Sequence, residues 1–172
     1  MCIRDRHTEA LSCFDQVLQL EPTHFDATYR KAMTLSVLSR HKEALLCIDN
    51  ALAISPNNPD ALYHKGLILL SLSNPAEALS YFDKALSVNQ NNPDALYHKG
   101  LTLLSLSNPT EALSYFDRAL AINPTHFDSL FKKAVTLGKL NRHTEALAYF
   151  DAAISINAQN AEAYYHKGQT LA

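Results

Sequence analysis

The feature of this 172-residue chain that most constrains its fold is an internal repeat of 34 residues. Residues 59–92 and 93–126 are identical at 26 of their 34 places. The same frame continues, with more divergence, over residues 25–58 and 127–160. A fixed period of about 20 to 50 residues is typical of arrays in which each repeat is one supersecondary unit stacked on its neighbours. The sequence therefore predicts four complete repeats.

The repeat frame also covers parts of both ends of the chain. Residues 6–24 match the second half of a repeat, because the run that begins at Arg6 recurs at Arg142. Residues 161–172 match a first half, which we expect to be a truncated repeat. Residues 1–5 fall outside the frame, so we expect a disordered, non-repeat start.

Each repeat contains two helical patterns separated by a short polar turn. Apolar and small residues recur at spacings of three and four in both halves, as on one face of an amphipathic helix. Asn58 precedes a proline and an acid, and Asn74 stands three places before Glu77, two patterns typical of helix N-termini. We therefore predict two helices in each repeat and ten in the chain.

Small and aromatic residues occupy fixed places in the repeat. The eighth place is glycine or alanine, and the twentieth place is alanine in every repeat that includes it. The twenty-fourth place holds Phe14, Ile48, Phe82, Phe116 and Phe150. On this pattern the chain resembles the tetratricopeptide repeat (TPR) family over all but residues 1–5. The resemblance implies an all-α fold, a right-handed α-solenoid of stacked helix-turn-helix repeats.

Lysine stands at the seventh place of each first helix, where the family often has leucine. These residues are Lys31, Lys65, Lys99, Lys133 and Lys167. A lysine can lay its aliphatic stem over an apolar surface and keep its ammonium in water. We therefore expect water to reach the contact between helices at this place of the repeat.

Composition and charge exclude several classes of function. Fifteen Lys and Arg against seventeen Asp and Glu give a net charge of −2, so the chain lacks the basic field that nucleic acids require. No window approaches about 18 uninterrupted apolar residues, and no secretion signal is visible at the start. We expect a cytoplasmic protein that binds neither nucleic acid nor membrane.

The histidines and acids do not form the patterns of a catalytic or metal site. All eight histidines stand in repeated columns, so duplication accounts for them. Histidines at equivalent places of successive repeats should lie on the order of 10 Å apart, too far for a shared zinc ion. No phosphate-binding loop or nucleophile elbow occurs. We expect no catalytic, cofactor or metal residues, and no enzymatic activity in this segment.

The candidate binding surface lies on the first helix of each repeat, on the side away from its main contact with the neighbouring helices. In the TPR family this helix lines a concave groove that holds peptides, and the resemblance implies the same here. The candidate groove residues are Tyr29, Asp60, Tyr63, His64, Leu67, Asp94, Tyr97, His98, Leu101 and Phe131. An acidic rim beside an aromatic and aliphatic floor favours an apolar or weakly basic segment. In the alternative interpretation, the fifth-place aromatics simply pack against the neighbouring helix.

One specialisation of the family bears on the partner. The carboxylate clamp that holds acidic chaperone C-termini would need Lys and Asn at places where this chain has Tyr, Phe or aliphatic residues, so such a partner is disfavoured. We therefore expect a non-catalytic protein-protein interaction scaffold that binds an extended peptide or partner helix. The alternative is the docking or regulatory arm of a larger enzyme, for example a glycosyltransferase, whose catalytic domain lies outside this segment.

The final helix lacks the polar outer face that usually closes a helical array. Tyr164, Gly168 and Leu171 occupy places that face a second helix in the other repeats. We therefore expect the segment to fray at this helix, to self-associate through uncapped terminal helices, or to be a fragment of a longer array.

Overall fold

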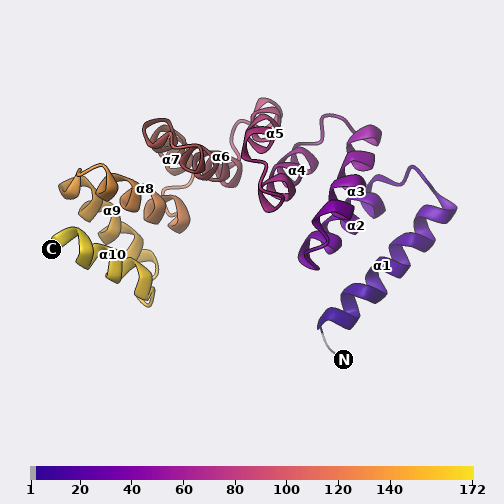
Figure 1. Ribbon diagram of the computed structural model, residues 1–172, viewed down its shortest axis with the longest axis horizontal. Coiled ribbons are helices and arrows are strands. Elements are labelled where there is room, and N and C mark those ends of the chain that lie inside the picture. The colour runs from indigo at the N-terminus through magenta and orange to yellow at the C-terminus, as the bar shows by residue number, and fades with distance from the viewer. Residues whose placement is uncertain (1–2) are drawn as a thin grey trace. The chain divides into compact units, whose positions relative to one another are not determined.

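The computed structural model of the protein describes residues 3–172, and the side chains from residue 6 onward. Within these residues the chain forms ten helices and no strand, as predicted (Figure 1). The chain divides into two compact units, residues 1–90 (unit 1) and 91–172 (unit 2).

Each unit contains five helices, and each helix packs against the next within its unit. Unit 1 consists of α1 (Ile3–Leu20), α2 (Phe25–Val37), α3 (His41–Ile54), α4 (Pro59–Ser71) and α5 (Pro75–Val88). Unit 2 consists of α6 (Pro93–Ser105), α7 (Pro109–Ile122), α8 (Phe127–Lys139), α9 (His143–Ile156) and α10 (Ala161–Leu171). Helices α2, α4, α6, α8 and α10 are the first helices of their repeats.

Helix α1 begins at Ile3, three residues before the start of the repeat frame. The expectation of disorder for residues 1–5 therefore does not describe residues 3–5, which are helical. Met1 and Cys2 lie outside the described residues. A helix can continue past a repeat boundary because propagation adds one hydrogen bond for each residue that is fixed.

The predicted helix starts are confirmed by their capping hydrogen bonds. Asn58 Oδ1 accepts from the backbone N–H of Ala61 at 2.9 Å. Asn74 accepts from the N–H of Glu77 while its amide donates to the Glu77 carboxylate at 2.7 Å. His24 caps α2 in the same way, because its Nδ1 accepts from Ala27 at 3.2 Å. Each cap pairs a backbone donor that the helix leaves unsatisfied.

The turn between the two helices of each complete repeat contains one left-handed residue. Ser39, Ser73, Ser107 and Asn141 have φ values of 59 or 60°. In the first of these turns, the N–H of Arg40 bonds back to the carbonyl of Leu35 at 2.9 Å, a closure typical of helix C-termini. These turns set the antiparallel direction of the second helix.

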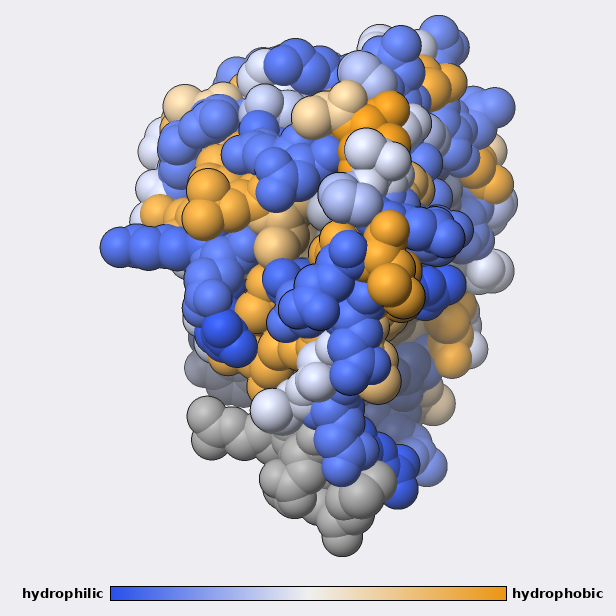
Figure 2. All heavy atoms as spheres, turned by 90° about the vertical axis from the view of Figure 1, so that its right-hand side faces the viewer, coloured by the Kyte–Doolittle hydropathy of each residue, from blue (hydrophilic) through white to orange (hydrophobic). Residues whose placement is uncertain are grey.

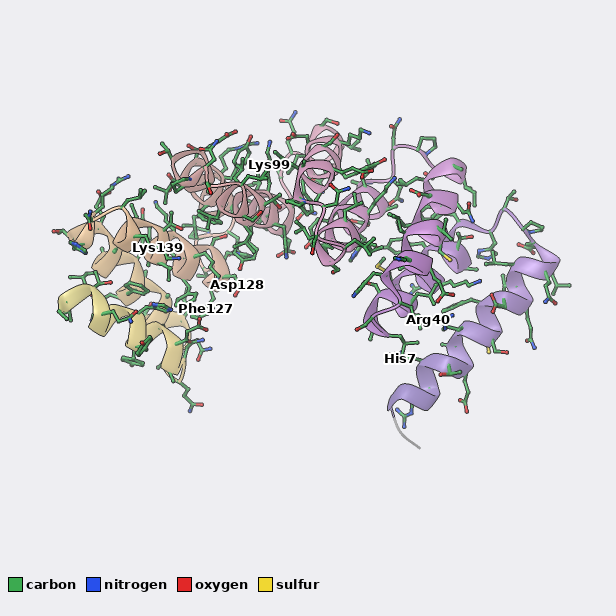
Figure 3. The ribbon with its side chains drawn as sticks, viewed as in Figure 1. His7, Arg40, Lys99, Phe127, Asp128 and Lys139 are labelled. Atoms are coloured by element: carbon green, nitrogen blue, oxygen red, sulfur yellow. The ribbon has the colours of Figure 1, made fainter. Side chains whose placement is uncertain are left out.

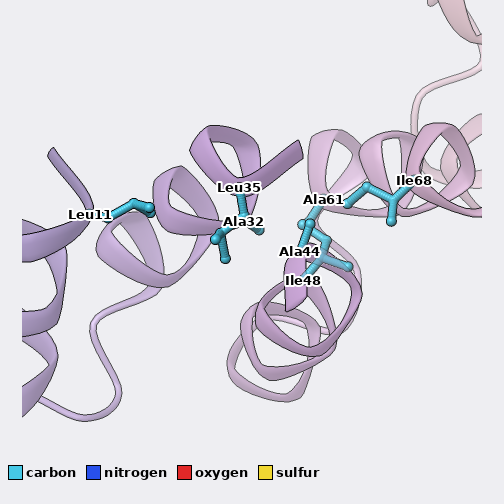
Figure 4. Close-up of a cluster of buried hydrophobic side chains, with 7 residues drawn as sticks. All are labelled: Leu11, Ala32, Leu35, Ala44, Ile48, Ala61 and Ile68. Atoms are coloured by element: carbon cyan, nitrogen blue, oxygen red, sulfur yellow. The ribbon is translucent and has the colours of Figure 1, made fainter. Parts of the chain in front are cut away.

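The core of each unit forms where small residues of one helix meet large residues of another. In unit 1, the buried cluster of Figure 4 joins α1 to α4 and contains Leu11, Ala32, Leu35, Ala44, Ile48, Ala61 and Ile68. Phe82, Phe116 and Phe150 are at most 1% exposed. On the α1 side of unit 1, shown in Figure 2, exposed apolar side chains are scattered among hydrophilic ones.

The seventh-place lysines differ from the sequence-based expectation. Lys65, Lys99 and Lys133 are buried, with only 7–8% of their surface exposed. The Lys65 ammonium lies 2.5 Å from Asp49 of the preceding repeat and donates to Tyr81 Oη at 2.6 Å. The ammonium therefore stays between helices instead of reaching water, because a carboxylate and a phenol replace its hydration.

The same lysine bridge recurs along both units. Lys31 pairs with Asp15 at 2.5 Å in unit 1. In unit 2, Lys133 pairs with Asp117, and Lys167 lies 2.5 Å from Asp151. Each bridge joins a first helix to the second helix before it, so it links successive repeats.

Candidate functional site

The fifth and sixth places of successive first helices form a stripe of aromatic and imidazole rings. In unit 1, the rings of Tyr29 on α2 and His64 on α4 have their centroids 5.7 Å apart, edge to face. In unit 2, Phe131 on α8 and His166 on α10 are also 5.7 Å apart. Aromatic rings at this separation are in direct contact. The stripe therefore runs from one first helix to another within each unit.

The predicted fifth-place anchors are not equally accessible. Tyr97 and Phe131 are buried, with 9% and 5% of their surface exposed, and Tyr97 contacts Phe116 and His126. Tyr29 and Tyr63 are half-buried. The rings of Tyr97 and Phe131 therefore pack mainly between helices, while Tyr29 and Tyr63 retain surface that a partner can contact.

Burial also shifts the pKa of the stripe residues. It raises the pKa of Tyr29 to about 12, helped by the negative charge of Asp60, and that of Tyr97 to about 12, helped by Asp128. Both phenols are therefore neutral hydrogen-bond donors at physiological pH.

His98 does not titrate as an unperturbed imidazole. Burial lowers its pKa, and the Asp94 and Asp128 charges offset this effect only in part. Its Nδ1 donates to the Asp94 carbonyl oxygen at 2.9 Å. His98 therefore keeps its neutral form to lower pH than the ordinary value of about 6.5 that its sequence context suggested.

The predicted acidic residues stand at the start of the first helices. Asp60 and Asp94 are both exposed. Asp94 Oδ1 lies 3.1 Å from His126 Nε2. His126 Nδ1 accepts from the backbone N–H of Ser129 at 3.2 Å, so Nε2 carries the proton that it donates to Asp94. The Asp94 carboxylate is thus engaged within unit 2, whereas Asp60 faces solvent.

A cavity of about 430 Å³ lies between α6 and α8 in unit 2. Its apolar lining includes Leu101, Leu104, Val135 and Leu140, and its basic lining is Lys132 and Lys139. Of the groove residues predicted from the sequence, Leu101 lines this cavity. Leu67 and Tyr63 instead pack against the buried cluster of Leu69, Ala78 and Phe82 in unit 1.

Lys139 lines this cavity but is not among the groove residues predicted from the sequence. A signal was present, because the thirteenth place is Ser71 and Ser105 in the two most similar repeats and Lys139 in the next. What the sequence could not show is that this residue and Lys132 line the same cavity.

A metal centre and a membrane-spanning helix would each need a specific arrangement of residues. Among the described residues, no group of three or more His, Cys, Asp or Glu side chains is arranged to hold a metal ion. None of the helices in the described part of the chain combines the length and the apolar character needed to cross a bilayer.

Comparison with family models decides the family. One tetratricopeptide repeat model matches residues 4–59, 29–93 and 63–127, and a second matches residues 103–169. The chain belongs to the tetratricopeptide repeat family. Together the matches cover nearly the whole TPR chain.

Several solved structures of other proteins have the same fold. YrrB, described as a TPR protein with an unusual peptide-binding site, is 29% identical over 95% of this chain and 84% of its own, with a TM-score of 0.79. MamA is 18% identical over 94% of this chain and 98% of its own, with a TM-score of 0.82. PilF of Pseudomonas aeruginosa is 22% identical over 97% of this chain and 80% of its own, with a TM-score of 0.84. No curated protein sequence matches this TPR chain.

Proposed function

We propose that this TPR protein is a non-catalytic scaffold that binds an extended peptide or a partner helix along the groove side of its first helices. Membership of the TPR family supports a role in protein interaction. The peptide-binding site named for YrrB supports a peptide as the partner.

The observation that carries the proposal is the cavity between α6 and α8, which joins two successive first helices. Its aliphatic side chains are only partly covered by the protein, so a partner gains free energy by removing them from water. A cleft with an apolar floor and a few polar groups is the usual form of a binding site.

Binding by this face is tested with peptides selected on the whole chain from a random displayed library. We expect Leu101→Asp to weaken the selected peptides at least ten-fold in fluorescence anisotropy, because a charge would replace part of the apolar floor. Leu46→Asp is the matched control, since Leu46 on α3 is 66% exposed and lies outside the cavity. If peptide affinity falls equally in both variants, or falls only in Leu46→Asp, the peptides bind outside this cavity.

The same groove serves the alternative in which this chain is the docking arm of a larger enzyme. Its peptide would then be a substrate of that enzyme. The selection experiment gives the same result in both cases, so it tests the groove and not the neighbouring domain.

A further inference from the structure

The residues that line the cavity between α6 and α8 indicate the chemistry of the ligand that it can bind. Its floor is aliphatic, with Leu101 and Leu104 supplied by α6 and Val135 by α8. Leu140, directly after α8, is 37% exposed and extends the apolar surface toward solvent. The floor therefore fits an aliphatic side chain of a partner.

The charged residues of this cavity are all basic. Lys132 and Lys139 line it, and no Asp or Glu does. The two lysines are seven residues apart on α8, about 10.5 Å along the helix axis, and lie on the same face. They therefore form two positive positions beside one apolar floor.

Neither lysine is neutralised by the protein. In the part of the chain with described side chains, Lys132 and Lys139 form no ion pair, whereas the neighbouring Lys133 pairs with Asp117. The Lys132 ammonium lies 5.4 Å from the centroid of the Phe131 ring. Figure 3 shows Lys139 at the opposite end of α8 from Phe127 and Asp128. A partner that brings carboxylates therefore finds both ammonium groups available.

Duplication does not explain this lysine pair. The equivalent places hold Arg30 and Val37 in the first complete repeat. They hold histidine and serine in each of the two most similar repeats. The pair is therefore specific to α8, in a chain whose net charge is −2.

We propose that this cavity binds an extended acidic segment of a protein partner, with an aliphatic side chain on the floor and two Asp or Glu side chains against Lys132 and Lys139. An extended chain advances about 3.3 Å per residue, so acids three places apart match the separation of the lysines. Complementary charge favours association and the choice of partner. This inference rests on the proposed function, and it replaces the apolar or weakly basic segment expected from sequence with an acidic one in unit 2.

The test examines the peptides selected on the whole chain. We expect enrichment of Asp and Glu on both sides of Leu, Ile or Val. A fluorescein-labelled consensus peptide, acetylated and amidated to remove its terminal charges, should bind Lys132→Gln and Lys139→Gln each several-fold more weakly, and the double variant at least ten-fold more weakly. Lys42→Gln, an exposed lysine on α3, is the matched control and should leave affinity unchanged.

The outcomes separate this inference from the proposed function. If the selected peptides are neutral or basic but their binding still depends on Leu101, the inference of an acidic ligand is wrong and binding in this cavity stands. Failure to select any peptide would count against both. A requirement for a free C-terminal carboxylate in place of internal acids would also overturn the inference. Because Lys139 is exposed, Lys139→Gln remains informative even if Lys132→Gln fails to fold.

Discussion

Gly66 on α4 lies directly against the ring of Phe82 on α5: a Cβ atom added to Gly66 would stand 2.6 Å from Phe82 Cε1. Gly100 and Phe116 repeat this relationship in unit 2, also at 2.6 Å. Phe82 is fully buried, so an added methyl group would have to displace a packed ring. The glycine therefore permits the close approach of the two helices of one repeat.

We expect Gly66→Ala to destabilise the protein by about 1–3 kcal/mol, because overpacking a filled core outweighs the better helix propensity of alanine. Gly168→Ala is the matched control. A Cβ there meets nothing within 4 Å, so that variant should be neutral or gain up to about 1 kcal/mol. Urea denaturation measures both.

A second substitution should rescue Gly66→Ala. The first complete repeat combines Ala32 with Ile48 at the same two places. We therefore expect Phe82→Ile to cost less in the Gly66→Ala background than in the wild type, a positive coupling in a double-mutant cycle. Strictly additive effects would show that the two side chains do not compete for the same space.

The buried lysine bridges should contribute to stability through their hydrogen bonds. Tyr81→Phe removes one of the two acceptors of the Lys65 ammonium, and we expect a loss of about 1 kcal/mol. The bonds to Asp49 and Tyr81 raise the pKa of Lys65 although burial lowers it, so Lys65 remains charged and needs its partners. Tyr164→Phe, at a half-exposed tyrosine, should change the free energy of unfolding by much less.

His98 should make the protein less stable in mild acid. Its pKa is lowered by burial in the folded state, whereas it is about 6.5 in the unfolded chain. Below pH about 6.5 the unfolded state therefore binds more protons, and stability falls as the pH drops toward the folded-state pKa.

The pH effect is measured by urea denaturation between pH 7.5 and 5. His98→Gln should reduce the loss of stability over this range, because glutamine does not titrate. His143→Gln, at an exposed histidine, is the control and should keep the wild-type slope. An unchanged slope in His98→Gln would assign the effect to other groups.

The exposed face of α10 should cause the 172-residue chain to associate. Tyr164 and Leu171 are 51% and 66% exposed, whereas Leu62 and Leu69 at the same places of α4 are 4% and 2% exposed. We expect a concentration-dependent sedimentation coefficient that Leu171→Glu lowers and Leu46→Glu leaves unchanged. A wild-type chain that stays monomeric at high concentration would contradict this prediction.

The repeat, the helices and much of their packing follow from the sequence alone. The caps at Asn58 and Asn74, and the small residues opposite Phe82 and Phe116, follow from local chemistry that recurs every 34 residues. Such features depend on residues close in sequence or on a column that every copy shares. The period therefore reveals them before any coordinates are known.

Which of the repeated residues are accessible, and which are paired, depends on the packing of the folded protein. Tyr63 and Tyr97 stand at the same place in nearly identical repeats, yet Tyr97 is buried and contacts His126, whereas Tyr63 is only half-buried. Lys65 was expected to reach water and is instead held by Asp49. The physical reason is that burial and ion pairing depend on side chains from neighbouring helices, whose positions arise from packing and not from the pattern along one helix.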